Sequence, residues 1–136
     1  MNLTIRPANL PDDYPGIARV LTSESPEWPT KAEDLAHEDA ARNPQLYWAV
    51  FVAEETRQDE KRLVGMVSVA SVGHDQLAHH EGKFKLNIRV QPDMQGLGVG
   101  SNLYQTVLKH LEPLAPCELY TEVWAAHPRC RALRYR

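Results

Sequence analysis

Residues 83–111 read KFKLNIRVQPDMQGLGVGSNLYQTVLKHL, and this stretch decides the fold. In its first eight residues apolar and polar side chains alternate strictly, which predicts a β-strand over Lys83–Val90. From Val99 onward the apolar residues recur at helical spacing, with Val99, Leu103 and Val107 in one row. The sequence therefore predicts a strand, a glycine-rich turn and a helix in direct succession.

The turn between these two elements has the composition of an anion-binding loop. Glycines at 96, 98 and 100 allow the backbone to turn sharply and to approach a ligand closely. The first N–H groups of the following helix have no partner within the helix, so they can bind a phosphate. A turn that serves packing alone is the alternative. Neither standard nucleotide motif is complete, because no lysine follows Gly100 and no glycine stands at Ser101 or Leu103.

The rest of the chain supplies further strands and helices around this unit. We expect strands at Leu3–Ile5, Tyr47–Ala53, Leu63–Val72 and Cys117–Trp124, and helices that start at Asp12 or Asp13, at a Thr30/Glu33 capping box and near the end of the chain. The residues from 47 to 53 are apolar on both faces, which indicates a strand covered on both sides. The order βααβββαβα predicts an α+β (mixed α/β) fold with helices on a largely antiparallel sheet.

The composition limits the class of protein. The chain has 136 residues, which we expect to form a single domain over residues 1–136. A net charge of −3 gives no support for nucleic-acid binding, and no apolar stretch is long enough to span a membrane. Two cysteines and the absence of a signal-peptide pattern favour the cytoplasm. The histidines and cysteines lack the spacing of metal ligands, so we expect no metal.

The turn resembles the pyrophosphate-binding segment of the GNAT N-acetyltransferase superfamily. Gln95, Gly98 and Gly100 fill the positions of its signature, Pro92 follows the strand as in the family, and the opening IRPANLPDD is similar to the family's first strand and helix. The resemblance implies acetyl-CoA as cosubstrate and transfer of its acetyl group to an amine of a small molecule or protein. It implies that the cofactor is held by backbone groups of Ile88, Val90, Gln95, Gly96, Leu97, Gly98, Val99, Gly100 and Ser101.

The same resemblance directs the search for an acid and a base. The family often takes the base from a carboxylate or a relayed water near the fourth or fifth strand. Among the carboxylates this makes Glu122 the candidate, with Glu81 as an alternative. The family's acid is a tyrosine on the next helix, and Tyr135 stands near that place. An exposed, solvated side chain is the alternative interpretation of the two glutamates, and fraying of a terminal residue is that of Tyr135. An acidic cluster (Glu24, Glu27, Glu33, Asp34, Glu38 and Asp39) either attracts a cationic amine or forms a solvated helical face.

Compared with the family, the sequence stops before the last helix and strands are complete. We therefore expect the edge of the Cys117–Trp124 strand to pair with a second copy, giving a homodimer. A catalytically silent acyl-CoA-binding or interaction domain, such as one half of a tandem acetyltransferase, is the alternative to an active enzyme.

Overall fold

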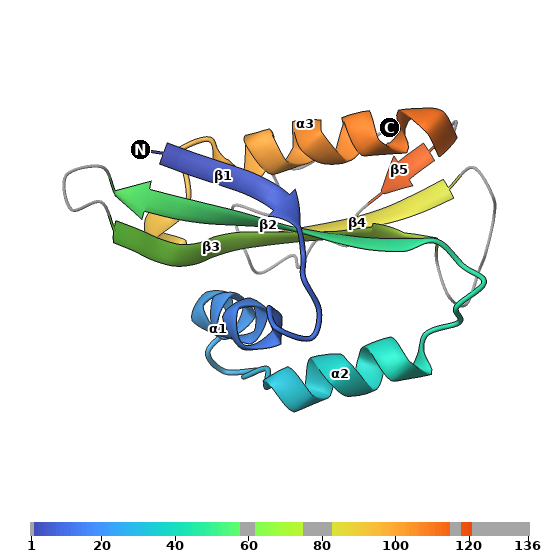
Figure 1. Ribbon diagram of the computed structural model, residues 1–136, viewed down its shortest axis with the longest axis horizontal. Coiled ribbons are helices and arrows are strands. Elements are labelled where there is room, and N and C mark those ends of the chain that lie inside the picture. Colours follow the sequence, from blue (N-terminus) through green and yellow to red (C-terminus); the bar gives the residue numbers. More distant parts are fainter. Residues whose placement is uncertain (1, 58–61, 75–82, 115–117, 121–136) are drawn as a thin grey trace.

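A mixed sheet with helices on both faces organises the computed structural model (Figure 1). The structure describes residues 2–57, 62–74, 83–114 and 118–120. Their elements are β1 (Asn2–Pro7), α1 (Tyr14–Glu24), α2 (Ala32–Ala41), β2 (Trp48–Arg57), β3 (Arg62–Gly73), β4 (Lys83–Val90), α3 (Val99–Leu111) and β5 (Glu118–Tyr120), with short 3-10 turns at Pro92–Met94 and Glu112–Leu114. This order agrees with the α+β prediction for the described part of the chain.

The strands lie in the order β1-β2-β3-β4-β5. Neighbours from β1 to β4 are antiparallel, in agreement with the expected largely antiparallel sheet. The fifth strand differs because it runs parallel to β4, with Phe84 opposite Leu119. A parallel neighbour requires a crossover connection, and α3 provides it.

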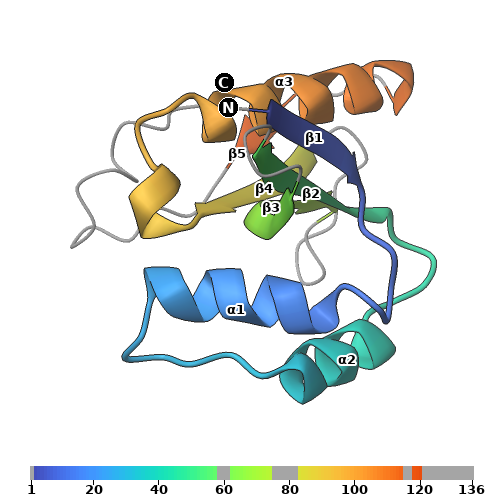
Figure 2. The same cartoon turned by 60° about the vertical axis from the view of Figure 1, so that its left-hand side comes forward.

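Two layers of helices cover the sheet (Figure 2). Helix α3 lies on one face, where Val99, Leu103, Val107 and Leu111 are buried, as the helical spacing predicted. Helices α1 and α2 lie on the other face, where Val20 packs in a second apolar cluster. Because helices cover both faces, the inner strand β2 buries Phe51 on one side and Val52 on the other, which confirms the expectation of a strand covered on both faces. No helix in the described ranges is both long and apolar enough to cross a membrane.

The start of α2 differs from the expected capping box. The backbone N–H of Lys31 donates to the Asp34 carboxylate at 3.0 Å, so the box lies one residue later than the predicted Thr30/Glu33 pair. Thr30 is engaged elsewhere, since its N–H donates to the hydroxyl of Thr22 at 3.0 Å. This tertiary contact ties the start of α2 to α1 and moves the first helical turn along the chain.

The start of α1 also departs from the local rule. Asp13 occupies the N-cap position, but its side chain makes no capping bond. It instead accepts hydrogen bonds from both terminal nitrogens of Arg6, at 2.7 and 3.0 Å, and from the N–H of Asn9 at 2.6 Å. The ion pair with Arg6 holds the pKa of the Asp13 carboxyl below its ordinary value. Asp13 therefore joins the end of β1 to the beginning of α1.

Candidate functional site

The turn between β4 and α3 has the backbone that its glycines predicted. Gly96 and Gly98 have φ angles of +81° and +86°, in the left-handed region that side chains other than glycine rarely adopt. A Cβ atom on Gly98 would meet no other atom within 4 Å, so the space beside this residue is open. Gly98 is exposed, and the turn therefore offers bare backbone to a ligand.

The backbone N–H groups of this turn are unpaired over a continuous run. From Gly96 to Ser101 none of them has a hydrogen-bond acceptor within the described part of the chain. The first helical bond is the next one, from Asn102 N–H to the carbonyl oxygen of Gly98 at 3.0 Å. These donors stand at the positive end of the α3 dipole, where a phosphate group would satisfy them.

The strand before the turn presents its backbone polar groups to one side. The N–H of Gln91 donates to the carbonyl oxygen of Val67 on β3 at 2.8 Å. Because backbone groups alternate along an antiparallel strand, those of Ile88 and Val90 face away from β3, toward the side on which β5 lies. A ligand arm could therefore bind there in the manner of an added strand.

The structure brings β4 and the turn into contact. The Gln95 side chain donates from Nε2 to the carbonyl oxygen of Val90 at 3.0 Å. A Cβ atom on Gly100 would lie 3.6 Å from Val90 Cγ2 and 3.8 Å from Ile88 Cγ2, which is ordinary packing distance. Gln95 and Gly100 of the turn thus lie directly against Ile88 and Val90 of β4.

Glu24, the last residue of α1, reaches the same edge of β4. Its Oε2 atom accepts a hydrogen bond from the Val90 N–H at 3.0 Å, and its Oε1 atom lies 3.0 Å from Nη1 of Arg89. The Glu24 side chain is only 5% exposed. Sequence reasoning missed this contact and placed Glu24 in the acidic cluster. The one indication in the sequence is the position of Glu24 at the C-terminus of a helix, where a negative charge interacts unfavourably with the helix dipole and therefore suggests a partner elsewhere.

Other acids of the cluster are also neutralised. Asp39 forms an ion pair with Arg42 and accepts a hydrogen bond from the Tyr14 hydroxyl, which raises the pKa of Tyr14. The Arg42 guanidinium lies 3.7 Å above the ring of Trp48. The cluster is therefore divided: Glu24 and Asp39 hold α1 and α2 to each other and to the sheet, whereas its other four members are exposed.

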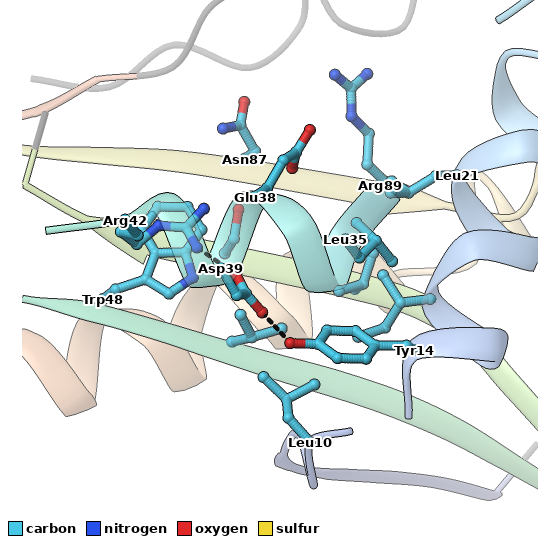
Figure 3. Close-up of a pocket in the computed structure, with 14 residues that line it drawn as sticks. Leu10, Tyr14, Leu21, Leu35, Glu38, Asp39, Arg42, Trp48, Asn87 and Arg89 are labelled. Atoms are coloured by element: carbon cyan, nitrogen blue, oxygen red, sulfur yellow. Dashed lines mark hydrogen bonds and ion pairs between the residues drawn. The ribbon is translucent and has the colours of Figure 1, made fainter. Parts of the chain in front are cut away.

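A cavity of about 300 Å³ lies between α1, α2 and the face of the sheet opposite α3 (Figure 3). Its apolar walls are formed by Leu10, Ile17, Leu21, Leu35, Val50 and Val69. Its polar lining consists of Tyr14, Glu38, Asp39, Arg42, Trp48, Ser71, Asn87 and Arg89. Two of these, Asn87 and Arg89, come from the strand whose edge carries Ile88 and Val90. The cavity therefore lies next to the backbone of Ile88 and Val90, on the face of the sheet that α1 and α2 cover.

The expected acid and base lie outside the described residues. Glu122, Tyr135 and the alternative base Glu81 all fall in ranges that the structure does not describe. His79 and His80 do so as well. Among the residues that are described, no three or more histidine, cysteine or acidic side chains are grouped to hold a metal ion.

Comparison with known proteins is consistent with this geometry. The model of the acetyltransferase (GNAT) family matches residues 14–134 of the chain. Similar solved structures include an N-acetyltransferase from Staphylococcus aureus Mu50, with 17% identity and a TM-score of 0.73 over 97% of this chain and 79% of that one. The ribosomal-protein-S18-alanine N-acetyltransferase from Escherichia coli has 20% identity and a TM-score of 0.66 over 96% and 73%.

A GNAT family acetyltransferase from Brucella melitensis, solved in complex with acetyl-CoA, has 19% identity and a TM-score of 0.61 over 94% of this chain and 80% of that one. Structures at this level of identity show a shared fold. No curated protein matches the chain significantly in sequence.

Proposed function

Because the chain belongs to the acetyltransferase (GNAT) family, we propose that it transfers the acetyl group of acetyl-CoA to an amine of a small molecule or protein. The observation that carries the proposal is the run of unpaired N–H groups from Gly96 to Ser101. It lies directly beside the edge of β4, where the side chains of Glu24 and Gln95 occupy the backbone groups of Val90. A pyrophosphate needs several donors that converge at a helix N-terminus, and an amide-bearing arm needs a strand edge. The described residues offer both within one surface.

The cofactor residues, with the exception of Gln95, keep the roles expected from the sequence. The N–H groups of Gln95 to Ser101 were expected to hold the pyrophosphate, but the Gln95 N–H donates to the carbonyl oxygen of Pro92 at 3.3 Å. The donors that would hold the pyrophosphate therefore run from Gly96 to Ser101, and backbone groups of Ile88 and Val90 would hold the pantetheine arm. The open space beside Gly98 permits the close approach that the pyrophosphate requires. Acetyl-CoA supplies an activated acetyl group as a thioester.

One contact has to change for this arrangement to form. The Val90 N–H is bound to the Glu24 carboxylate, so an amide carbonyl of the cofactor arm can accept this hydrogen bond only after Glu24 has released it. Arg89 still offers Glu24 a counter-charge. Glu24 is thus a competitor for one of the backbone donors of the cofactor site.

The acceptor amine would lie in the cavity between α1, α2 and the sheet, on the opposite side of β4 from α3. Acyl transfer to an amine requires a group that accepts the amine proton and is helped by one that protonates the departing sulfur. Glu122 as base and Tyr135 as acid stay our proposals for these roles. A cytoplasmic location and a homodimer also belong to the proposal.

The test begins with binding of acetyl-CoA, measured by calorimetry on the purified chain. Gly98→Val should abolish binding, because the side chain would fill the open space over the turn. Because Gly98 has a left-handed backbone, the substitution should lower the free energy of unfolding by about 1–2 kcal/mol. A thermal melt of the same sample measures this loss and checks that the variant is still folded. Gly100→Ala is the matched control. Its methyl group meets Val90 and Ile88 at ordinary packing distance, so binding should survive.

Release of CoA thiol in the presence of amines then tests the activity. Unchanged affinity in a folded Gly98→Val variant would refute the assignment of the turn. Binding of acetyl-CoA without thiol release over a broad amine panel would identify the catalytically silent module instead of the enzyme. Absence of acetyl-CoA binding would contradict both.

A further inference from the structure

Two buried hydrogen-bond donors at the cavity have no acceptor within the described part of the chain. They are Nε of Arg42, which directly follows α2, and the indole Nε1 of Trp48, the first residue of β2. Both residues line the cavity between α1, α2 and the sheet. Because most buried polar groups in folded proteins are paired, two unpaired donors at one place indicate a ligand that carries acceptor atoms.

Packing holds the two donors next to each other. The Arg42 Cζ atom lies over the Trp48 ring, 3.7 Å from its centre. The indole itself lies against Gly73 of β3, where a Cβ atom would come within 2.5 Å of Trp48 Cε3. Gly73 thus leaves the space that the Trp48 ring occupies. Figure 3 shows Arg42 and Trp48 together at one end of the cavity.

Asp39 occupies only part of the Arg42 guanidinium. One oxygen of its carboxylate pairs with Nη1, and the other accepts a hydrogen bond from the Tyr14 hydroxyl. Nε and Nη2 of Arg42 have no acceptor among the described residues, and together they form the pair of parallel donors that binds a carboxylate through two hydrogen bonds. The Arg42 side chain is 17% exposed, so a ligand can still approach the guanidinium.

The register of the sheet places these donors near the proposed cofactor surface. Trp48 lies opposite Gly73, and two residues along the same sheet Ser71 lies opposite Asn87. Two residues of a strand span about 7 Å. Asn87 directly precedes Ile88, so a small ligand held by the two donors can extend along the cavity to the part of β4 where the cofactor arm is proposed to bind.

We propose that Arg42 and Trp48 form a carboxylate-binding subsite, and that the acceptor amine belongs to an amino acid. The proposal rests on the proposed function, since it assigns the residues that select the acceptor in the same site. The carboxylate takes Nε and Nη2 of Arg42 and the Trp48 indole N–H, while Asp39 keeps Nη1. A zwitterion adds no net charge to a cavity in which Asp39 already neutralises Arg42. An amine without a carboxylate would leave both donors unpaired, which is the basis of the selection.

Binding of an amino acid and of its carboxamide, measured without acetyl-CoA, tests the subsite. The standard amino acids are screened by thermal shift, and calorimetry compares the tightest-binding one with its own amide, which has nearly the same shape but an uncharged acceptor. We expect the acid to bind about tenfold more tightly, because hydrogen bonds to a charged group are about twice as strong as neutral ones. In the thiol-release assay kcat/KM should favour the acid by a similar factor.

Two conservative variants assign this preference to the proposed residues. Arg42→Lys keeps the charge that pairs with Asp39 but removes the fork of donors, and Trp48→Phe keeps a ring beneath the guanidinium but removes the indole N–H. Each should reduce the preference for the acid over the amide by at least about threefold. Trp28→Phe is the matched control, because Trp28 is 69% exposed and does not line the cavity, and it should leave the preference unchanged.

The proposal is overturned if no standard amino acid binds, or if the amide binds as tightly as the acid or is the better substrate. It is also overturned if either variant keeps the full preference while a thermal melt shows that it is folded. The proposed function fails separately, through absence of acetyl-CoA binding, because the amino-acid titrations contain no acetyl-CoA.

Discussion

Removal of Glu24 should strengthen the binding of acetyl-CoA. The carboxylate accepts the Val90 N–H at 3.0 Å and is 5% exposed, so it occupies a donor that the cofactor arm is proposed to use. In Glu24→Ala this donor is free before the cofactor arrives. The substitution leaves no buried unpaired charge, because 37% of the Arg89 side chain is exposed and its guanidinium can be hydrated when it loses Glu24.

The size of the effect follows from the two hydrogen bonds that are exchanged. A hydrogen bond to a charged group contributes about 1.5–3 kcal/mol, and the neutral amide bond that replaces it about 0.5–1.5 kcal/mol. The cofactor therefore loses about 1–1.5 kcal/mol when it displaces Glu24. Since 1.4 kcal/mol corresponds to a factor of ten, the dissociation constant of Glu24→Ala should fall by roughly tenfold.

Calorimetric titration with acetyl-CoA at constant ionic strength measures this change. Glu27→Ala is the matched control, because it removes the same charge from an exposed position three residues further along the chain and should leave the affinity nearly unchanged. Glu24→Gln, which keeps an acceptor oxygen without the charge, should fall between the two. Unchanged or weaker binding in a folded Glu24→Ala variant would refute the competition and, with it, the use of the Val90 N–H by the cofactor.

Three further outcomes are expected. Arg6 lowers the pKa of Asp13 from its ordinary value of 3.8, so the ion pair stabilises the fold above that pH and the contribution is lost as the pH falls. Asp13→Asn should lower the free energy of unfolding by about 1 kcal/mol near pH 7. Urea unfolding at a series of pH values should also show a free energy of unfolding that depends less on pH in the acid range. Should Glu122 or Tyr135 be catalytic, Glu122→Gln or Tyr135→Phe will lower kcat by about a hundredfold or more without changing the affinity for acetyl-CoA, and full activity in both would exclude them. Light scattering over a dilution series should show a dimer, whereas a monomer at high micromolar concentration would contradict the prediction from the CELYTEVW strand.

Local sequence patterns predicted the structure correctly where the direction of a side chain is determined by the helix or strand to which it belongs. The alternation over Lys83–Val90 predicted β4 with its observed bounds, since a period of two forces one set of side chains to the same face. The row of Val99, Leu103 and Val107 predicted the buried face of α3 for the same reason at helical period. The turn conformation at Gly98 followed from the residue type, because glycine alone adopts this backbone without strain.

Contacts between distant parts of the chain could not be predicted in this way. Glu24 and Val90 are far apart in sequence, and only the packing of α1 against the sheet brings the carboxylate to the strand edge. Asp39 pairs with Arg42, whereas Glu38 has no ion-pair partner among the described residues, although the six acids of the cluster look alike in the sequence.

The sequence by itself therefore determined the family signature, most of the element order and the backbone conformation of the glycine turn, because periodicity and glycine conformation are local properties. The tertiary structure alone decided the parallel place of β5, the cavity and the hydrogen bond from the Val90 N–H to Glu24. These depend on which side chains meet across the sheet, and that is settled by the free energy of packing the whole fold.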